Sequence, residues 1–129
     1  MTMRTLLSLY AMIAVVFCLG LCVMPVFWIT LYGAHADPQA ILLLRLVGAL
    51  FGGPAVMTWK ARNAERSKSR DAIVLGLIFF NGLGAFAALL GALSGVYNQF
   101  AWGPVATFTL CAIAFLLVGR EAISSSTPN

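Results

Sequence analysis

The run TLLSLYAMIAVVFCLGLCVMPVFWITL, residues 5–31, contains no Asp, Glu, Lys, Arg or His. Further apolar runs follow it at residues 38–59, 72–95 and 99–119, and Arg45 is the only charged residue inside these runs. A helix needs about 20 apolar residues to cross a hydrocarbon core of about 30 Å. Each run is long enough, so the sequence predicts four membrane-spanning helices. The first run exceeds one crossing, and we expect it to tilt or to extend past the interface.

The composition supports this class of protein. Hydrophobic residues make up 61% of the 129 residues and charged residues 9%, against roughly 45–50% and about 25% in soluble domains. In lipid the backbone groups must pair within the protein, and the runs lack the alternation of barrel strands. We therefore expect an all-α integral membrane protein, a four-helix transmembrane bundle that forms one domain over residues 1–129. The polar residues 124–129 are expected to be a disordered tail.

Polar residues and prolines mark the ends and bends of the predicted helices. Asp37 can cap the second helix, because it is followed by a proline suited to the first helical position. Residues 60–71 form a polar loop before the third helix, and residues 94–98 form a turn before the fourth. Pro25 and Pro54 lie inside predicted helices and should kink them.

Lys and Arg gather on one side of the predicted membrane. Residues 60–71 hold most of them, Arg4 precedes the first helix and Arg120 ends the fourth, whereas the other two loops contain none. Because cytoplasmic segments are enriched in Lys and Arg, both termini and this loop are expected in the cytoplasm, in a bacterial inner membrane. The cations flank apolar runs, which argues against a nucleic-acid partner.

The N-terminal segment has a second interpretation. Arg4, the apolar run and residues 34–36 together resemble a signal peptide with a small-residue cleavage site. Cleavage would leave three helices in the same orientation. The apolar run is longer than the usual 7–15 residues, and Trp28 and Tyr32 suit the interfacial anchor of a retained helix. We expect retention, and cleavage within the first 36 residues stays open as the alternative.

Arg45 is the sharpest candidate for function, because a cation in the hydrocarbon costs about 2.5–3.5 kcal/mol at mid-membrane. Its long side chain can snorkel to the headgroups, or it can bind an anion, a lipid headgroup or a cofactor. It shares a helix face with Gly48 and Gly52, so we expect it to point into the bundle. The loop residues expected near it, as a tentative binding set, are His35, Asp37, Tyr97, Asn98 and Trp102.

Small residues recur at a spacing of four in two of the predicted helices. Such stripes let helix backbones approach, and this packing is a main source of association in membranes. Near the middle of the third helix, Asn81 is expected to bond to another helix, with a transport role as the alternative. The contacts can lie within the bundle, with a partner protein or with a second copy. The predicted packing positions are Gly48, Gly52, Asn81, Gly84, Ala88 and Gly91.

Residues that carry chemistry are sparse. His35 is the single histidine and cannot make a metal site alone, although axial ligation of a haem or chlorophyll would need only one. Cys18, Cys22 and Cys111 lie inside apolar runs, and their odd number argues against a disulfide framework. A metal or redox pair at the first two cysteines is the alternative to plain packing. Without a nucleophile motif or phosphate loop, we expect no catalytic residue, no metal and no enzyme.

The chain shares several points with known small membrane proteins. These are Pro25 in a long first helix, RLVGA at residues 45–49, a basic central loop, NGLG at residues 81–84, and residues 94–95 followed by Trp102. In this layout it resembles four-helix bacterial membrane proteins, including the DoxX-like group. The resemblance implies the fold, and it implies no agreed activity and no catalytic residues.

These features favour an accessory or interaction subunit of a membrane complex. Its expected partners are the lipid bilayer and other membrane proteins or a second copy of the chain. A small transporter, or a lipid- or cofactor-binding protein that uses Arg45, is the alternative function. A solid apolar interior would favour the first, and a polar cavity around Arg45 would favour the second.

Overall fold

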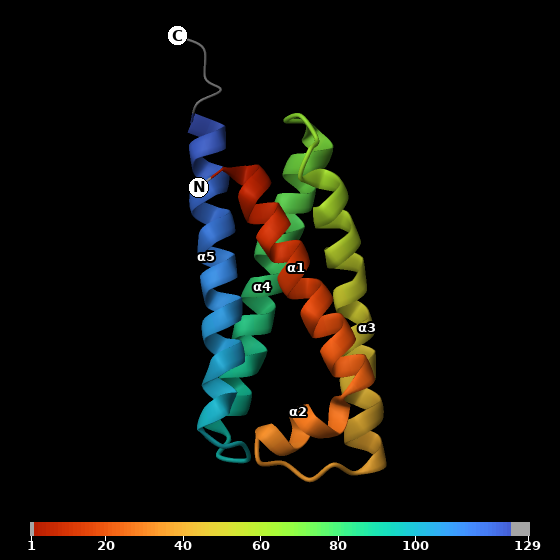
Figure 1. Ribbon diagram of the computed structural model, residues 1–129. Helices are drawn as coiled ribbons and strands as arrows, with labels where there is room; N and C mark the ends of the chain where they lie inside the picture. The colour runs from red at the N-terminus through yellow and green to blue at the C-terminus, as the bar shows by residue number, and fades with distance from the viewer. Residues whose placement is uncertain (1, 125–129) are drawn as a thin grey trace.

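The computed structural model describes residues 2–124, with side chains for residues 2–120. Over this range the chain is helical and contains no strand, which confirms the all-α prediction. The disordered tail expected at the C-terminus lies outside the described residues, except for its first residue. The elements, shown in Figure 1, are α1 (Met3–Val23), α2 (Pro25–Leu31), α3 (Pro38–Ala61), α4 (Lys68–Leu93), the 3₁₀ helix η1 (Gln99–Ala101) and α5 (Trp102–Ser124).

Four segments of the described chain are long and apolar enough to cross a membrane, as the sequence predicted. Helices of 21 to 26 residues rise about 1.5 Å per residue, so they extend about 31–39 Å. This length covers a hydrocarbon core of about 30 Å. The four segments are α1, α3, α4 and the continuous stretch of η1 and α5 up to Arg120.

The first apolar run is not one helix, so that part of the prediction is wrong. α1 ends at Val23, and Met24 takes a non-helical conformation with φ −123° and ψ 50°. The helix α2 begins at Pro25, and it runs across the end of the molecule (Figure 1). Proline has no N–H to donate, and its ring clashes with the preceding turn. The surplus length of the run therefore becomes a separate short helix, whereas α3 continues without interruption through Pro54.

Caps fix where the other helices begin. The Asp37 side chain accepts a bond from the amide of Ala40 at 2.8 Å, which confirms the predicted cap of α3. Ser67 caps α4 in the same way, so this helix begins at Lys68 rather than at the predicted residue 72. α4 ends at Leu93, two residues earlier than predicted, and Gly95 takes the left-handed conformation with φ 73° in the turn that follows.

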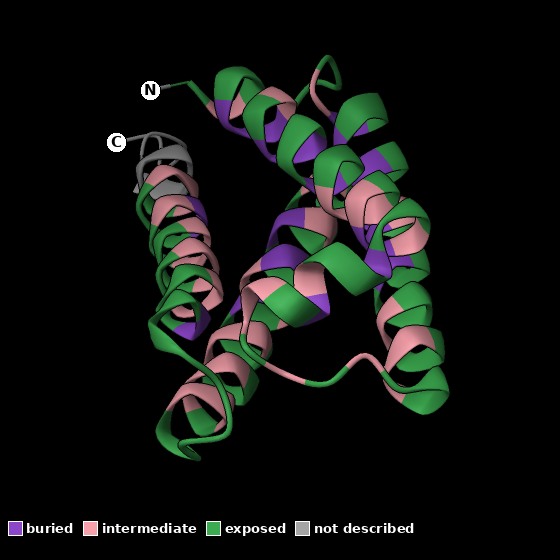
Figure 2. Ribbon diagram, turned by 60° about the horizontal axis from the view of Figure 1, so that its bottom comes forward, coloured by how far each residue is buried: buried purple, intermediate pink, exposed green. Residues whose placement is uncertain are grey.

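The helices form two pairs. α1 packs chiefly on α3, and α4 packs chiefly on α5, while fewer contacts join one pair to the other. Near the N-terminus of α1 the pairs meet in a core, and they diverge toward the opposite end (Figure 1). Figure 2 shows buried residues on the faces that the helices turn toward each other and exposed residues on the outer faces. Members of this core are Leu6, Leu7, Tyr10, Val74, Leu77 and Phe115.

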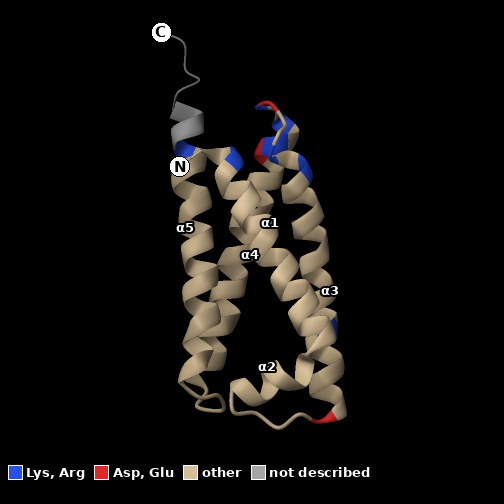
Figure 3. Cartoon of the chain, in the orientation of Figure 1, with Lys and Arg blue, Asp and Glu red and all other residues tan. Residues whose placement is uncertain are grey.

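Charge distinguishes the two ends of the molecule. Figure 3 shows Lys and Arg concentrated where α1 begins and where α3 passes to α4, with a further cation on α5 just before its grey end. We call this the basic end, defined by Arg4, residues 60–71 and Arg120. The other end, formed by α2 and by residues 32–37 and 94–98, is called the far end. It carries no Lys or Arg in either loop.

Candidate functional site

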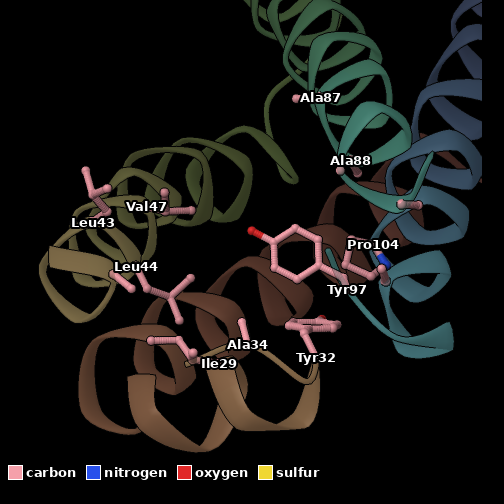
Figure 4. A pocket seen from close by; sticks show the side chains of 14 residues that line it. Ile29, Tyr32, Ala34, Leu43, Leu44, Val47, Ala87, Ala88, Tyr97 and Pro104 are labelled. Atoms are coloured by element: carbon pink, nitrogen blue, oxygen red, sulfur yellow. The ribbon is translucent and has the colours of Figure 1, made fainter. Parts of the chain in front are cut away.

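A cavity of about 440 Å³ opens between the two helix pairs at the far end (Figure 4). Its volume falls within the range of about 300–1,000 Å³ that is usual for ligand pockets. α3 and α4 form two walls, and α2, the far-end loops, η1 and the start of α5 supply the rest. It is lined by Ile29, Tyr32, Ala34, Ala40, Leu43, Leu44, Val47, Ala87, Ala88, Gly91, Ala92, Tyr97, Ala101 and Pro104.

The cavity follows from the residues that face it. On α4 the wall consists of small side chains, of which Ala88 and Gly91 are two, and these leave much of the space beside the backbone empty. On α3 the opposite wall carries the branched side chains of Leu44 and Val47. Because each of these helices packs on the other member of its own pair, few contacts draw the two walls together and a space remains. The space is apolar because the side chains of both walls are apolar.

Two tyrosine hydroxyls are the main polar groups of the cavity. Figure 4 shows the ring of Tyr97 lying across the cavity with its hydroxyl directed toward α3. A tyrosine phenol is protonated at neutral pH and can donate a hydrogen bond, and burial raises the pKa of Tyr32 further. Among the described residues that line the cavity, none carries a charge. The arrangement suits an apolar ligand with at most a few hydrogen-bond acceptors.

The tentative binding residues do not form one site. Tyr97 lines the cavity, whereas His35, Asp37 and Trp102 are exposed at the far end and do not line it. The carboxylate of Asp37 is occupied by the cap of α3. Trp102 is the first residue of α5.

Asn98 is a structural anchor rather than a ligand contact. Its side-chain amide donates to the carbonyl of Leu31 at 2.8 Å, and its backbone amide donates to the carbonyl of Tyr32 at 3.0 Å. Its side-chain oxygen accepts from the amide of Phe100 at 3.0 Å. These bonds join the loop before η1 to the end of α2, so Asn98 holds Tyr97 in place at the cavity.

The expectation that Arg45 points into the bundle is wrong. Its side chain is exposed, and it makes no hydrogen bond or ion pair with any described residue. Its backbone carbonyl accepts a hydrogen bond from the thiol of Cys22 at 3.5 Å. At about 100° per residue, Arg45 lies about 60° around the helix from Gly48. Gly48 is buried, and this rotation is enough to carry the arginine from the buried face to the lipid-facing surface.

The predicted packing positions are used within the chain, but unequally. A Cβ atom at Gly48 would lie 2.9 Å from the Cβ of Leu21, so α3 and α1 are in close contact there. At Gly52 the nearest atom would be 3.6 Å away, which is an ordinary contact. Gly84 is the tightest of the set, with a ring carbon of Phe108 at 2.7 Å. Gly91 and Ala88 instead line the cavity.

The structure offers no further chemistry in its described part. Cys18, Cys22 and Cys111 are all free thiols and partly buried. No group of three or more His, Cys, Asp or Glu side chains is arranged to hold a metal ion among the residues that are described. The cavity, rather than a reactive group, is therefore the candidate site.

Sequence reasoning missed most of the cavity wall. Tyr32 was read as an interfacial anchor, and Leu44 and Val47 were indistinguishable from other apolar residues of a membrane helix. The usable signal was the small-residue stripe of α4, which includes Ala88 and Gly91. It marks a surface of low volume, but it does not reveal whether a neighbouring helix or a cavity faces it.

The fold and the cavity define a four-helix membrane protein with an apolar site of ligand size. The family described as Domain of unknown function (DUF8292) matches residues 1–119, and the chain belongs to this family. The match covers all the membrane-spanning segments apart from the last residue of the fourth. No curated protein and no solved structure matches the chain.

Proposed function

We propose that this chain is a membrane protein without chemistry of its own that holds the acyl chain of a membrane lipid in the far-end cavity. The observation that carries the proposal is the apolar cavity of about 440 Å³ between α3 and α4. The bilayer supplies acyl chains at high local concentration. A ligand of this kind needs no charged partner, and the cavity offers none among its described lining residues.

The dimensions and the polar groups fit this ligand. From Ala40 to Val47 the α3 wall spans seven residue steps, which is about 10 Å at 1.5 Å per residue. This length is about two thirds of one leaflet of a core of about 30 Å. The hydroxyls of Tyr32 and Tyr97 can donate to ester or headgroup oxygens at the end of such a chain. Burying a charged solute in the same place would leave its charge unpaired.

A transporter that uses Arg45 receives less support. The lining of the cavity does not include Arg45, and the exposed side chain is suited to snorkelling along α3 toward the headgroups. A solid apolar interior was expected for an accessory subunit, and a polar cavity around Arg45 was expected for a transporter. The interior has an apolar cavity instead, so it matches neither expectation. The acyl-chain proposal keeps the lipid-binding part of that second alternative and discards the role of Arg45.

We further propose that the protein lies in a bacterial inner membrane with its basic end in the cytoplasm. The concentration of Lys and Arg at that end supports this orientation. The cavity then opens in the outer half of the membrane, and its lipid comes from the periplasmic leaflet.

Lipid analysis of the purified protein tests the proposed function. The full chain is extracted in polymer nanodiscs, transferred to a mild detergent and washed, and the retained lipids are quantified by mass spectrometry. We expect about one retained lipid per chain. The substitution Ala88→Leu fills the cavity from the α4 wall and should remove this lipid. The matched control is Ala106→Leu, which adds the same volume at an exposed position near the start of α5 that does not line the cavity.

A photoreactive lipid with a diazirine on its acyl chain gives an independent measurement. Cross-links should concentrate on cavity residues such as Leu44 and Tyr97 and should be lost in the Ala88→Leu variant. Cross-links spread evenly over the lipid-facing surfaces, or equal lipid retention in both alanine variants, would contradict the proposal.

A second candidate is the accessory or interaction subunit expected from the sequence. The small residues on the α4 wall, including Ala87 and Ala92, are of the type that lets another helix approach closely. A transmembrane helix of a partner or of a second copy would then occupy the cavity. Chemical cross-linking in native membranes distinguishes the two: a protein adduct that is lost in Ala88→Leu and retained in Ala106→Leu supports the partner, and a lipid adduct alone supports the first candidate.

A further inference from the structure

A second cavity, of about 380 Å³, lies at the basic end between the last turns of α3 and the first turns of α4. Its wall changes character along the helix axes. Val56, Met57 and Ile73 lie toward the middle of the helices, and Lys60 and Arg70 lie about one turn nearer the basic end. The apolar part of the cavity therefore lies nearer the middle of the helices, and the cationic part lies nearer the basic end. A phospholipid has the same order, with its acyl chains inside the membrane and its phosphate at the surface.

The depth of the cavity agrees with a membrane boundary. Val56 stands 18 residues after the start of α3 at Pro38, which is about 27 Å along the axis. This is close to the full hydrocarbon thickness of about 30 Å. Lys60 lies about 6 Å further on, in the headgroup layer. The apolar part of the cavity thus faces the acyl chains, and its cations face the phosphates.

Both cations that line the cavity have hydrogen-bond donors or charge without a partner among the described residues. The guanidinium of Arg70 donates through Nη1 to the carbonyl of Ala64 at 2.8 Å, but its buried Nε has no hydrogen-bond partner. Lys60 forms no ion pair with a described residue. A buried donor without an acceptor is unfavourable, so an anionic oxygen in this cavity would stabilise the structure.

The neighbouring arginines Arg62 and Arg66 differ, because they do not line the cavity and each contacts another side chain. Arg66 lies 3.8 Å from the carboxylate of Asp71. The guanidinium of Arg62 stacks over the ring of Trp59 at 3.1 Å from its centroid. Arg62 also has a buried nitrogen, Nη1, without a hydrogen-bond partner, but Lys60 and Arg70 are the cations that line the cavity among the described residues.

We propose that this cavity binds one anionic phospholipid of the leaflet at the basic end. Lys60 and Arg70 hold the phosphate, and an acyl chain lies over Val56, Met57 and Ile73. An anionic headgroup is favoured over a zwitterionic one, because the ammonium group of the latter would approach two cations. The inference is independent of the far-end cavity and of its ligand.

Native mass spectrometry of the full chain in mild detergent tests the inference, with phosphatidylglycerol and phosphatidylcholine as competing probes. We expect one phosphatidylglycerol per chain to bind in preference to phosphatidylcholine. A cation near the membrane surface contributes about fivefold to the affinity for an anionic lipid. Lys60→Gln should therefore weaken phosphatidylglycerol binding about fivefold. The matched control, Lys68→Gln, removes one charge from the same basic end at an exposed position that does not line the cavity, and should change the affinity little.

Further measurements keep the result unambiguous. The double variant Lys60→Gln/Arg70→Gln should weaken binding at least about twentyfold, with its helix content by circular dichroism unchanged. Equal weakening by Lys60→Gln and Lys68→Gln, or equal affinity for the two lipids, would overturn the proposal. So would complete displacement of the lipid by millimolar inorganic phosphate, since that outcome indicates a site for a soluble anion. Ala88→Leu should leave this binding unchanged, which separates it from the lipid of the far-end cavity.

Discussion

The amide of Asn81 on α4 donates a hydrogen bond to the hydroxyl of Tyr10 on α1 at 3.0 Å, and both residues are buried. The same amide donates to the carbonyl of Leu77 in its own helix at 2.8 Å. The ring of Tyr10 packs edge-on against Phe115 of α5, with centroids 5.2 Å apart. One polar contact therefore joins the two helix pairs at the point where α1, α4 and α5 meet.

Removal of this contact should loosen the junction between the pairs. Tyr10→Phe leaves the aromatic packing intact and deletes the acceptor for Asn81. Interhelical hydrogen bonds in membrane proteins average about 0.6 kcal/mol and reach about 1.7 kcal/mol, so we expect a loss of this size in reversible unfolding in mixed micelles. Asn81→Leu should destabilise the protein by a similar amount. In a double-mutant cycle the two changes should not add, and full additivity would show that the bond contributes nothing.

A second prediction concerns Gly48 and Gly52 of α3. The sequence predicts the same packing role for both, but the structure shows a closer helix contact at Gly48 than at Gly52. Gly48→Ala places a methyl group 2.9 Å from the Cβ of Leu21, so α1 and α3 must move apart. Overpacking of this kind costs about 1–3 kcal/mol. Gly52→Ala meets only the Sγ of Cys18 at 3.6 Å and should be tolerated. Thermal unfolding of both variants in the same detergent is the measurement, and equal stability of the two would contradict the close contact at Gly48.

Much of the fold was predictable because the membrane restricts it so strongly. Length and hydropathy alone predict the spanning helices, and Asp37 and Pro38 mark the start of α3 correctly. The break at Met24 was harder to predict, since proline can either kink a helix or end it. The choice depends on the packing of α2 across the far end, which lies beyond the local sequence.

The candidate site was predictable only in part, for a geometric reason. The prediction that Gly48 contacts a neighbouring helix was correct. The contact face is narrow enough that a rotation of about 60° from Gly48 places Arg45 outside it. The cavity arises from the divergence of the two helix pairs, which depends on which helices pair with each other. Ala88 and Gly91 look the same in sequence whether they face a helix or an empty space.

The anchor at Asn98 should control the far-end cavity without contacting its ligand. Asn98→Ala removes the bonds to the carbonyl of Leu31 and from the amide of Phe100. The loop that carries Tyr97 then keeps only the backbone bond from residue 98 to the carbonyl of Tyr32, so lipid retention should fall while the helix content remains. Gln99→Ala, at the next and exposed position, is the control. Retention of the lipid at the level of the unchanged protein would exclude this positioning role.

Orientation can be tested with single cysteines in a background in which the three native cysteines are replaced by alanine. Asn63→Cys lies in the basic-end loop, and Gln99→Cys lies at the far end, both at exposed positions. In intact cells a membrane-impermeant maleimide should label residue 99 and not residue 63, because the basic end is expected in the cytoplasm. After the cells are permeabilised, both should react. Labelling of residue 63 in intact cells would reverse the proposed orientation.

The last prediction concerns Arg45, whose exposed side chain has no partner among the described residues. If the guanidinium only reaches along α3 to the headgroups, Arg45→Leu removes a charge from the membrane and breaks no contact within the protein. Insertion should become more favourable, by less than the roughly 2.5–3.5 kcal/mol that applies at mid-membrane. Thermal stability and lipid retention should not change.

Arg62→Leu provides the contrast for Arg45→Leu. This arginine is half-buried and stacks at 3.1 Å over the ring of Trp59, and cation–π contacts contribute about 0.5–1 kcal/mol at exposed sites and about 2 kcal/mol when desolvated. Its removal should therefore lower the stability by an amount within this range, although both variants exchange an arginine for a leucine near an end of α3. If Arg45→Leu instead destabilises the protein or releases the far-end lipid, then Arg45 has a binding partner in the membrane, and the snorkelling interpretation is wrong. An unchanged protein would show that neither stability nor lipid retention depends on the intramembrane charge.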